Sequence, residues 1–209
     1  MCPINQRGEI SMTNEVEKDL AERVRLIENM MAEGRRKTES WGWSFVLWGV
    51  AYYVATAWAT WGRASLAWPV TMIAAAVITG VVASRMSHGQ PETRVGRALG
   101  AIWVSMGVSI FVLLMSLAYS GRYDEHVFVA IIGAMLGLAN AASGIILKWR
   151  IQFVCAVVWL ASAVIACFGS ENLTSIDFLV ATFIGLIVFG IYTMVLESRR
   201  RKQSGVAHA

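Results

Sequence analysis

The sequence is poor in the residues that carry charge and chemistry. Only 15% of its 209 residues are charged, whereas soluble domains average about 25%. It contains three histidines, three cysteines and three prolines. Its longest apolar stretches hold no Lys, Arg or His, and their one carboxylate, Asp177, lies at a boundary. Since the longest segment between these stretches is 85–97, no room remains for a soluble catalytic domain.

No group of residues has the pattern of a catalytic or metal site. His126 is expected on the opposite side of a bilayer from His88 and His208, so the three cannot share a metal ion. Asp124 and Glu125 next to His126 could hold a cation loosely, although a solvated turn is the simpler interpretation. No nucleophile has a base in reach, and no Gly-rich phosphate loop is present. We therefore predict a protein that is not an enzyme and uses no cofactor or metal.

What the chain does have is six apolar stretches of about twenty residues each. At about 1.5 Å rise per residue, twenty helical residues cover the roughly 30 Å hydrocarbon core of a bilayer. A core helix of a soluble protein would be shorter and would show a polar face. The sequence thus predicts an all-α, polytopic integral membrane protein with six transmembrane helices, at 41–61, 66–84, 98–120, 127–147, 151–169 and 176–196.

The segments between these stretches alternate in charge. Twelve basic residues lie in 35–37, 85–97, 148–150 and 199–202, whereas the opposite segments hold only Arg63 and Arg122. The positive-inside rule then predicts that both termini are cytoplasmic, which agrees with an even number of spans. Short loops favour a bacterial inner membrane. Two basic clusters are expected to contact anionic lipid headgroups: Arg35, Arg36 and Lys37, and Arg199, Arg200, Arg201 and Lys202.

The tryptophans raise the question of an internal repeat. Trp48, Trp103 and Trp159 stand 55 and 56 residues apart, each in an odd-numbered span. This spacing is compatible with three tandem helical hairpins. The residues around the three tryptophans share little else, so three coincident core tryptophans remain the other interpretation.

The fourth span carries a stripe of small residues with two polar neighbours. Such stripes let helices approach closely in lipid, so we expect this span to pack at the centre of the bundle. A side-chain amide in hydrocarbon needs a partner or water, so the alternative hypothesis is that the stripe borders a polar cavity. No span holds a mid-membrane Asp, Glu or His or an interior proline, which argues against proton-coupled transport and broken helices. The residues are Gly133, Gly137, Asn140, Ala141, Ser143 and Gly144.

The polar N-terminal segment contains an amphipathic pattern. Residues 14–37 are predicted to form a cytoplasmic helix, with Asn14 and Glu17 as a capping pair and 1–13 disordered. Residues 14–33 carry six acids and three bases, so repulsion from an anionic leaflet disfavours lying on lipid. We expect the apolar stripe of this helix to dock on a cytoplasmic protein or on a second copy of the chain. The alternatives are a helix folded back on its own chain and a solvated stalk. The stripe is Val16, Leu20, Val24, Ile27 and Met31.

The sequence leads to one main functional hypothesis and one alternative. The main hypothesis is an anchor, sensor or regulatory subunit that acts through its N-terminal helix, with residues 41–196 as membrane domain and 197–209 as a basic cytoplasmic tail. The alternative is a small uniport- or channel-like transporter with a path near the fourth span. The four-residue basic run in the tail gives no case for nucleic acid, and Met12 could be an alternative start.

Overall fold

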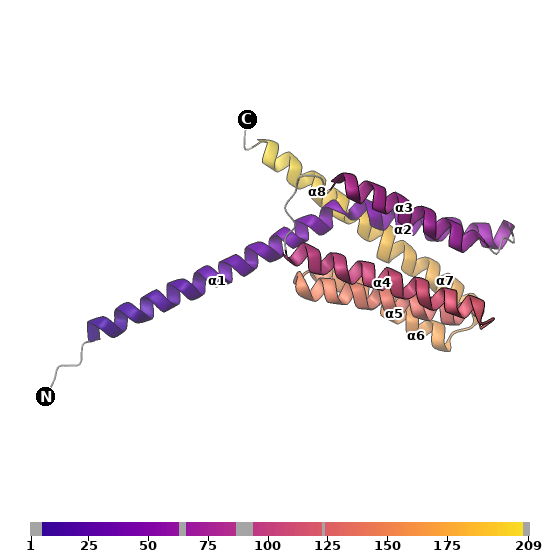
Figure 1. Cartoon of the computed structure of the whole chain (residues 1–209), viewed down its shortest axis with the longest axis horizontal. Helices are drawn as coiled ribbons and strands as arrows, with labels where there is room; N and C mark the ends of the chain where they lie inside the picture. The colour runs from indigo at the N-terminus through magenta and orange to yellow at the C-terminus, as the bar shows by residue number, and fades with distance from the viewer. Residues whose placement is uncertain (1–5, 63–65, 87–93, 123, 207–209) are drawn as a thin grey trace.

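The computed structural model is a bundle of long helices from which the first helix projects at one end (Figure 1). It describes residues 6–62, 66–86, 94–122 and 124–206. No strand occurs in these ranges. The elements are α1 (Gln6–Ser40), α2 (Gly42–Gly62), α3 (Ala67–Met86), α4 (Arg94–Tyr119), α5 (Glu125–Ile146), α6 (Arg150–Phe168), α7 (Glu171–Thr182), the π-helical η1 (Phe183–Val188) and α8 (Phe189–Val206).

Five helical stretches are long and apolar enough to cross a membrane: α3, α4, α5, α6 and the continuous α7–η1–α8. This agrees with a helical, membrane-integrated protein. The predicted first span corresponds to α2, which has 21 residues. It does not belong to the five, and it is rich in Trp and Tyr, whose polar ring atoms lower its mean hydropathy.

The helix ends differ from the predicted ones mainly at the two termini. α1 begins at Gln6, so residues 6–13, which we expected to be disordered, are helical. The last helical stretch runs without a break from Glu171 to Val206, so most of the predicted basic tail continues the final span as helix. One reason is that 197–202 holds five strong helix formers, and Arg201 pairs with Glu197 one turn away at 2.6 Å. Residues 1–5 and 207–209 lie outside the described ranges.

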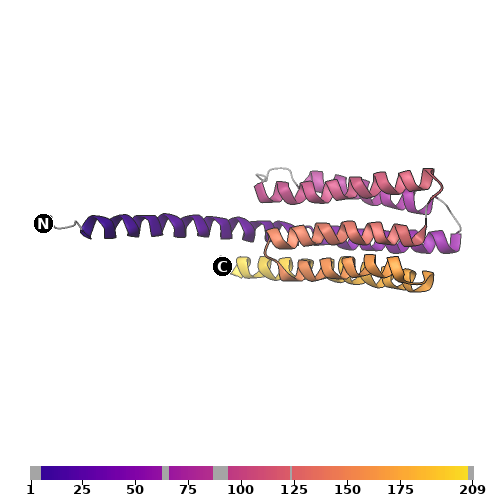
Figure 2. The same ribbon diagram turned by 90° about the horizontal axis from the view of Figure 1, so that it is seen from below.

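From α2 onward the chain runs back and forth along the bundle (Figure 1). The α5–α6 turn and the C-terminal ends of α1 and α8 lie at one end, and the C-terminal ends of α2, α4 and α6 lie at the other (Figures 1 and 2). The first end therefore gathers Arg35, Arg36, Lys37, Lys148, Arg150 and Arg199–Lys202. The second end carries Asp124, Glu125 and Glu171.

The glycines of the predicted small-residue stripe lie against α6. A methyl group added at Gly133 would lie 2.8 Å from the Trp159 carbonyl oxygen, and one at Gly144 would lie 3.0 Å from the Phe153 backbone nitrogen. At Gly137 it would meet the Leu160 side chain at 2.7 Å. α5 and α6 form the most extensive helix pair of the described chain. Half of the residues in the apolar stretch of α5 are buried, against 6% in that of α4. We conclude that α5 lies at the centre of the bundle and α4 at its edge.

Two groups of aromatic rings join the remaining helices to this pair. Near the acidic end, Tyr52, Trp68, Phe128 and Phe178 meet edge to face, with ring centroids 4.6–5.9 Å apart across α2, α3, α5 and α7. Toward the basic end, a second group links α2, α4 and α8. It consists of Phe45, Trp103, Phe189 and Trp149.

The helices do not pack as three equivalent hairpins. The α5–α6 pair joins the second predicted hairpin to the third. Trp159 is fully buried and contacts Gly185 of η1, whereas Trp48 and Trp103 are only partly buried. The three tryptophans that suggested a repeat thus lie in unlike surroundings.

The α5–α6 contact predicts opposite outcomes for two Gly→Ala variants. Gly133→Ala forces a methyl group onto the α6 backbone and should lower the free energy of unfolding by about 1–3 kcal/mol. Gly107→Ala, on α4, meets nothing within 4 Å. It should be neutral or stabilising by up to about 1 kcal/mol, because Ala favours the helix. Thermal unfolding in detergent measures both, and equal shifts in the same direction would contradict this packing.

Candidate functional site

The outer part of α1 presents an apolar stripe that nothing in the described chain covers. Leu20, Val24 and Ile27 are 61%, 49% and 47% exposed, and Met31 is partly buried where the helix reaches the bundle. Every residue from 17 to 30 is exposed. Val16 lies in α1, but its side chain is outside the described set. These are the residues that the sequence analysis singled out for docking.

α1 extends away from the bundle rather than across its end. In both views it continues outward from the basic end, and its outer part lies beside no other element (Figures 1 and 2). Its contacts with α8, α4 and α2 fall at its C-terminal part, which we call the α1 base (residues 34–40). A helix that lies in a membrane interface would instead run across the bundle axis.

The α1 base is held first by the turn between α5 and α6. α5 ends in a Schellman motif: the Trp149 N–H donates to Gly144 O at 2.8 Å and the Lys148 N–H to Ile145 O at 3.1 Å. Lys148 occupies the left-handed position with φ 47°, where glycine is more usual. The motif leaves the carbonyls of Leu147 and Lys148 available at the negative end of the helix dipole.

Arg35 of α1 binds those two carbonyls. Its Nε donates to Leu147 O at 2.6 Å and its Nη2 donates to Lys148 O at 2.9 Å. A guanidinium fork suits this geometry, since charged donors make shorter and stronger hydrogen bonds than neutral ones. The preceding residue, Gly34, packs closely against the side chains of Leu147 and Val95. Thus α4 and the turn between α5 and α6 both contact the α1 base.

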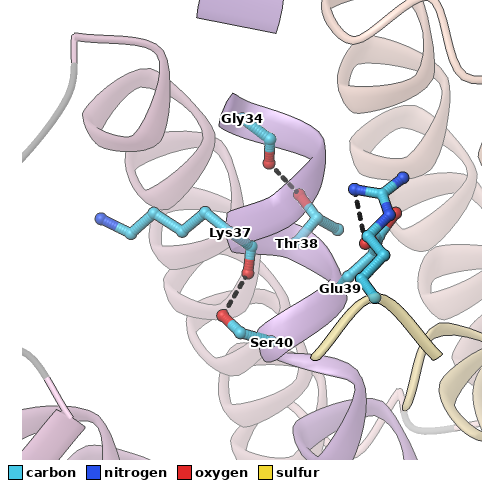
Figure 3. Close-up of polar contacts among 6 residues, drawn as sticks. Gly34, Lys37, Thr38, Glu39 and Ser40 are labelled. Atoms are coloured by element: carbon cyan, nitrogen blue, oxygen red, sulfur yellow. Dashed lines mark hydrogen bonds and ion pairs between the residues drawn. The ribbon is translucent and has the colours of Figure 1, made fainter. Parts of the chain in front are cut away.

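The second anchor of the α1 base is an ion pair with α8. Glu39 points from α1 toward α8 (Figure 3) and is only 2% exposed. Its Oε2 lies 3.0 Å from Nη1 of Arg200, whose side chain is half exposed. Burial raises the pKa of the Glu39 carboxyl above its ordinary value, and Glu197 adds to this. The positive charges of Arg200, Arg36 and Arg35 oppose the rise without cancelling it.

The α1 base passes into α2 through a short turn at Trp41. Thr38 and Ser40 donate their hydroxyls to backbone carbonyls of the preceding turn (Figure 3). Beyond the turn, Gly42 and Gly190 bring the backbones of α2 and α8 together. A methyl group on Gly42 would lie 2.9 Å from Gly190 O, and one on Gly190 would lie 2.8 Å from Gly42 O. The turn between α1 and α2 is therefore preceded by side-chain hydrogen bonds in α1 and followed by close packing of α2 against α8.

The basic residues predicted to contact lipid fall into two sets. Arg36 and Arg199 are exposed, as is Lys202, and Lys37 is partly exposed. Arg35, Arg200 and Arg201 also bind protein groups. The sequence analysis missed these pairings and missed Glu39. A glutamate two residues before an apolar span was the one signal that could have pointed to it.

A second group of polar side chains lies inside the bundle. Asn140 and Ser143, both predicted site residues, are fully buried, while Ala141 is partly buried. The Asn140 amide donates to Leu136 O of its own helix at 2.9 Å. Several polar atoms inside the bundle have no hydrogen-bond partner within the described protein: Asn140 Oδ1, Ser143 Oγ, both amide atoms of Gln152, Trp159 Nε1, Ser162 Oγ and Thr182 Oγ1.

The acidic end carries a small polar cluster around His126. Its Nδ1 lies 2.9 Å from Ala166 O and 3.2 Å from Thr174 Oγ1. Because a carbonyl only accepts, Nδ1 carries the proton, and the ring ties α5 to α6 and α7. It borders a hollow of about 420 Å³ with Cys167 and Phe168 on its wall. No group of three metal-ligating side chains occurs in the described part of the chain, and His88 falls outside it.

The raised pKa of Glu39 predicts a pH-dependent stability. A carboxyl whose folded pKa lies above its unfolded value of 4.5 contributes most when it is protonated. This contribution is complete below pH 4.5 and is lost as the pH rises through the folded value. The natural chain should therefore lose thermal stability relative to Glu39→Gln over that range. Unfolding midpoints of both proteins between roughly pH 4 and 8 test this, and a constant difference would contradict it.

Comparison with known proteins adds no assignment to these observations. The chain matches no family model, no curated protein and no solved structure. A functional conclusion for this chain therefore depends on its own residues and their geometry.

Proposed function

We propose that this chain is a six-span membrane protein that acts as an anchor, sensor or regulatory subunit by engaging a protein through α1. One observation carries the proposal: α1 holds an exposed apolar stripe on a rod whose base is fixed to the bundle. An exposed stripe of this kind costs free energy in water, and burying it against a partner removes that cost.

In this proposal α2 also crosses the membrane, in addition to the five stretches named above. It has 21 residues, against 20 in α3 and 19 in α6, runs along the bundle, and packs against α3 and α8. Trp43, Trp58 and Trp61 lie near its ends, where indoles favour the membrane–water interface. The gathering of basic residues at the end that carries α1 and α8 supports a cytoplasmic position for both termini. With loops this short, a bacterial inner membrane is the setting we favour.

A protein partner is favoured over a lipid surface by charge and direction. Six acids and three bases in 14–33 would be repelled by an anionic leaflet. The rod also points outward along the bundle rather than across it (Figure 2). Its stripe therefore reaches into the cytoplasm, where another helix can cover it.

Because the α1 base is attached to the bundle, a partner that binds α1 can affect the membrane domain. Arg35 connects α1 to the end of α5, and Glu39 connects it to α8. A partner that binds differently to two arrangements of α1 would shift the equilibrium between them. In a regulatory subunit, the α1 base would therefore couple partner binding to the arrangement of the bundle.

Crosslinking in cells tests the docking role of α1. The natural chain is compared with a Leu20→Glu, Ile27→Glu variant, which places two charges in the stripe. A Leu26→Glu, Asn29→Glu variant is the matched control, because it adds the same charge to the opposite side of the helix. We expect a crosslinked species that the stripe variant loses and the control retains.

Two results would count against this function. One is that no crosslinked species forms in the natural chain at its native expression level. The other is that the stripe variant and its control retain the species equally. In either case the apolar stripe is not a docking element.

A second candidate is a small uniport- or channel-like transporter with a path beside α5. The unpartnered polar atoms of Asn140 and Ser143 favour it, because such atoms are costly in a dry core. The close contact of Gly133, Gly137 and Gly144 with α6 leaves little room on that side.

Cysteine labelling separates this candidate from the first. Single cysteines at positions 136–144 are treated with a membrane-impermeant thiol reagent, with a cysteine at exposed Asp124 as the reactive control. A path predicts labelling at positions on one face of α5. Uniformly unreactive positions alongside a reactive control would remove the transport proposal.

A further inference from the structure

We infer that the occupant of the α1 stripe is a second copy of this chain, aligned in parallel and in register. This inference rests on the proposed function, since it names the partner of the same surface. It is carried by three features of α1: the order of its apolar residues, the position of one charged pair, and the direction in which the helix leaves the bundle.

The apolar residues that remain exposed follow a heptad. Leu20 and Ile27 occupy d positions and Val24 and Met31 occupy a positions, with alternating spacings of four and three. Gly34 would be the next d position, but it is buried against Leu147 and Val95. We call the row of these a and d positions the seam. No other element of the described chain covers the seam from its outer end up to the point where the bundle begins. Val24 at a next to Leu20 at d suits a parallel pair, while Ile27 at d and Met31 at a keep the rest of the seam apolar.

The flanking charges distinguish the two orientations of such a pair. Arg23 stands at a g position and Glu28 at the following e position, five residues later. In a parallel pair, g of one helix meets the following e of its partner, so two Arg23–Glu28 ion pairs form between the copies. In an antiparallel pair, g meets g and e meets e. With the four apolar residues aligned, Arg23 would then face Met30 and Glu28 would face Ala21.

Both charged residues are available for this exchange. In the single chain Arg23 pairs with Asp19 of its own helix at 2.9 Å, and the two side chains are 72% and 61% exposed. An exposed pair one turn apart contributes little and rearranges readily. Glu28 is exposed as well. An interhelical pair beside a buried seam loses more water and is correspondingly stronger.

The membrane domain supplies the orientation. Two copies inserted in one membrane project α1 from the same end of the bundle and in the same direction (Figures 1 and 2). They can therefore meet in parallel and not head to tail. Two heptads form too short a coiled coil to associate strongly from dilute solution. Confinement of both copies to one membrane raises their effective concentration, as a linker does, without any new contact.

Disulfide trapping in the full-length chain tests this arrangement. In a Cys2→Ser, Cys167→Ser background, which retains the buried Cys155, Ile27→Cys places one thiol in the seam. A parallel pair in register brings the two thiols together, so a dimer should form on mild oxidation in native membranes. Asn29→Cys, on the outer side of α1, is the matched control and should trap several-fold less.

Charge reversal then tests the Arg23–Glu28 pairing in the trapped protein. Arg23→Glu alone, or Glu28→Arg alone, places like charges across the seam and should lower the trapped fraction by about fivefold. The double variant, Arg23→Glu with Glu28→Arg, restores opposite charges and should recover trapping. Loss without recovery would overturn the pairing in this register.

The outcomes separate this inference from the proposed function. If the cellular crosslink depends on the stripe but joins a different protein, and Ile27→Cys does not trap, the function stands and self-association is wrong. If the crosslink does not depend on the stripe, both fail. A trapped dimer that Asn29→Cys forms equally well reflects chance collision and also overturns the inference.

Discussion

The close approach of α5 and α6 is the contact on which the rest of the arrangement depends. In lipid, helices gain little from the hydrophobic effect, so association relies on backbone proximity, which Gly133 and Gly144 allow. The pair then fixes the turn between its helices, where a Schellman motif leaves two carbonyls facing α1. Arg35 binds these carbonyls, and so the direction of α1 follows from packing inside the membrane domain.

The bundle and the outer part of α1 differ in which side chains they bury and which they expose. The bundle buries polar side chains on α2, α5, α6, α7 and α8, with few charges and many aromatic contacts. The outer part of α1 does the opposite, exposing apolar residues among charges. The α1 base is where the two meet, and it uses charge for both anchors, Arg35 on carbonyls and Glu39 on Arg200. In the proposed function, a partner bound to the outer part of α1 would act on the bundle through these charged contacts.

Much of this arrangement could be predicted from the sequence, because composition and periodicity are local. The apolar stretches, the stripe on α1 and the glycines of α5 each follow from residue order alone. The anchors of the α1 base could not be predicted this way. Arg35 and Leu147 are 112 residues apart, and an arginine beside a membrane is as compatible with lipid as with a carbonyl. The helical start at Gln6 was also missed, because the first residues show no apolar pattern.

Hydrogen exchange of the full chain in lipid nanodiscs tests the anchored α1 base most directly. Amides of residues 34–40 should exchange slowly in the natural chain, and about tenfold faster in Arg35→Ala, since a charged hydrogen bond contributes about 1.5–3 kcal/mol. Arg25→Ala, on the exposed outer part of the same helix, should leave this segment unchanged. If residues 34–40 exchange at the same rate in the natural chain and in Arg35→Ala, Arg35 does not hold α1 to the bundle, and the account is wrong.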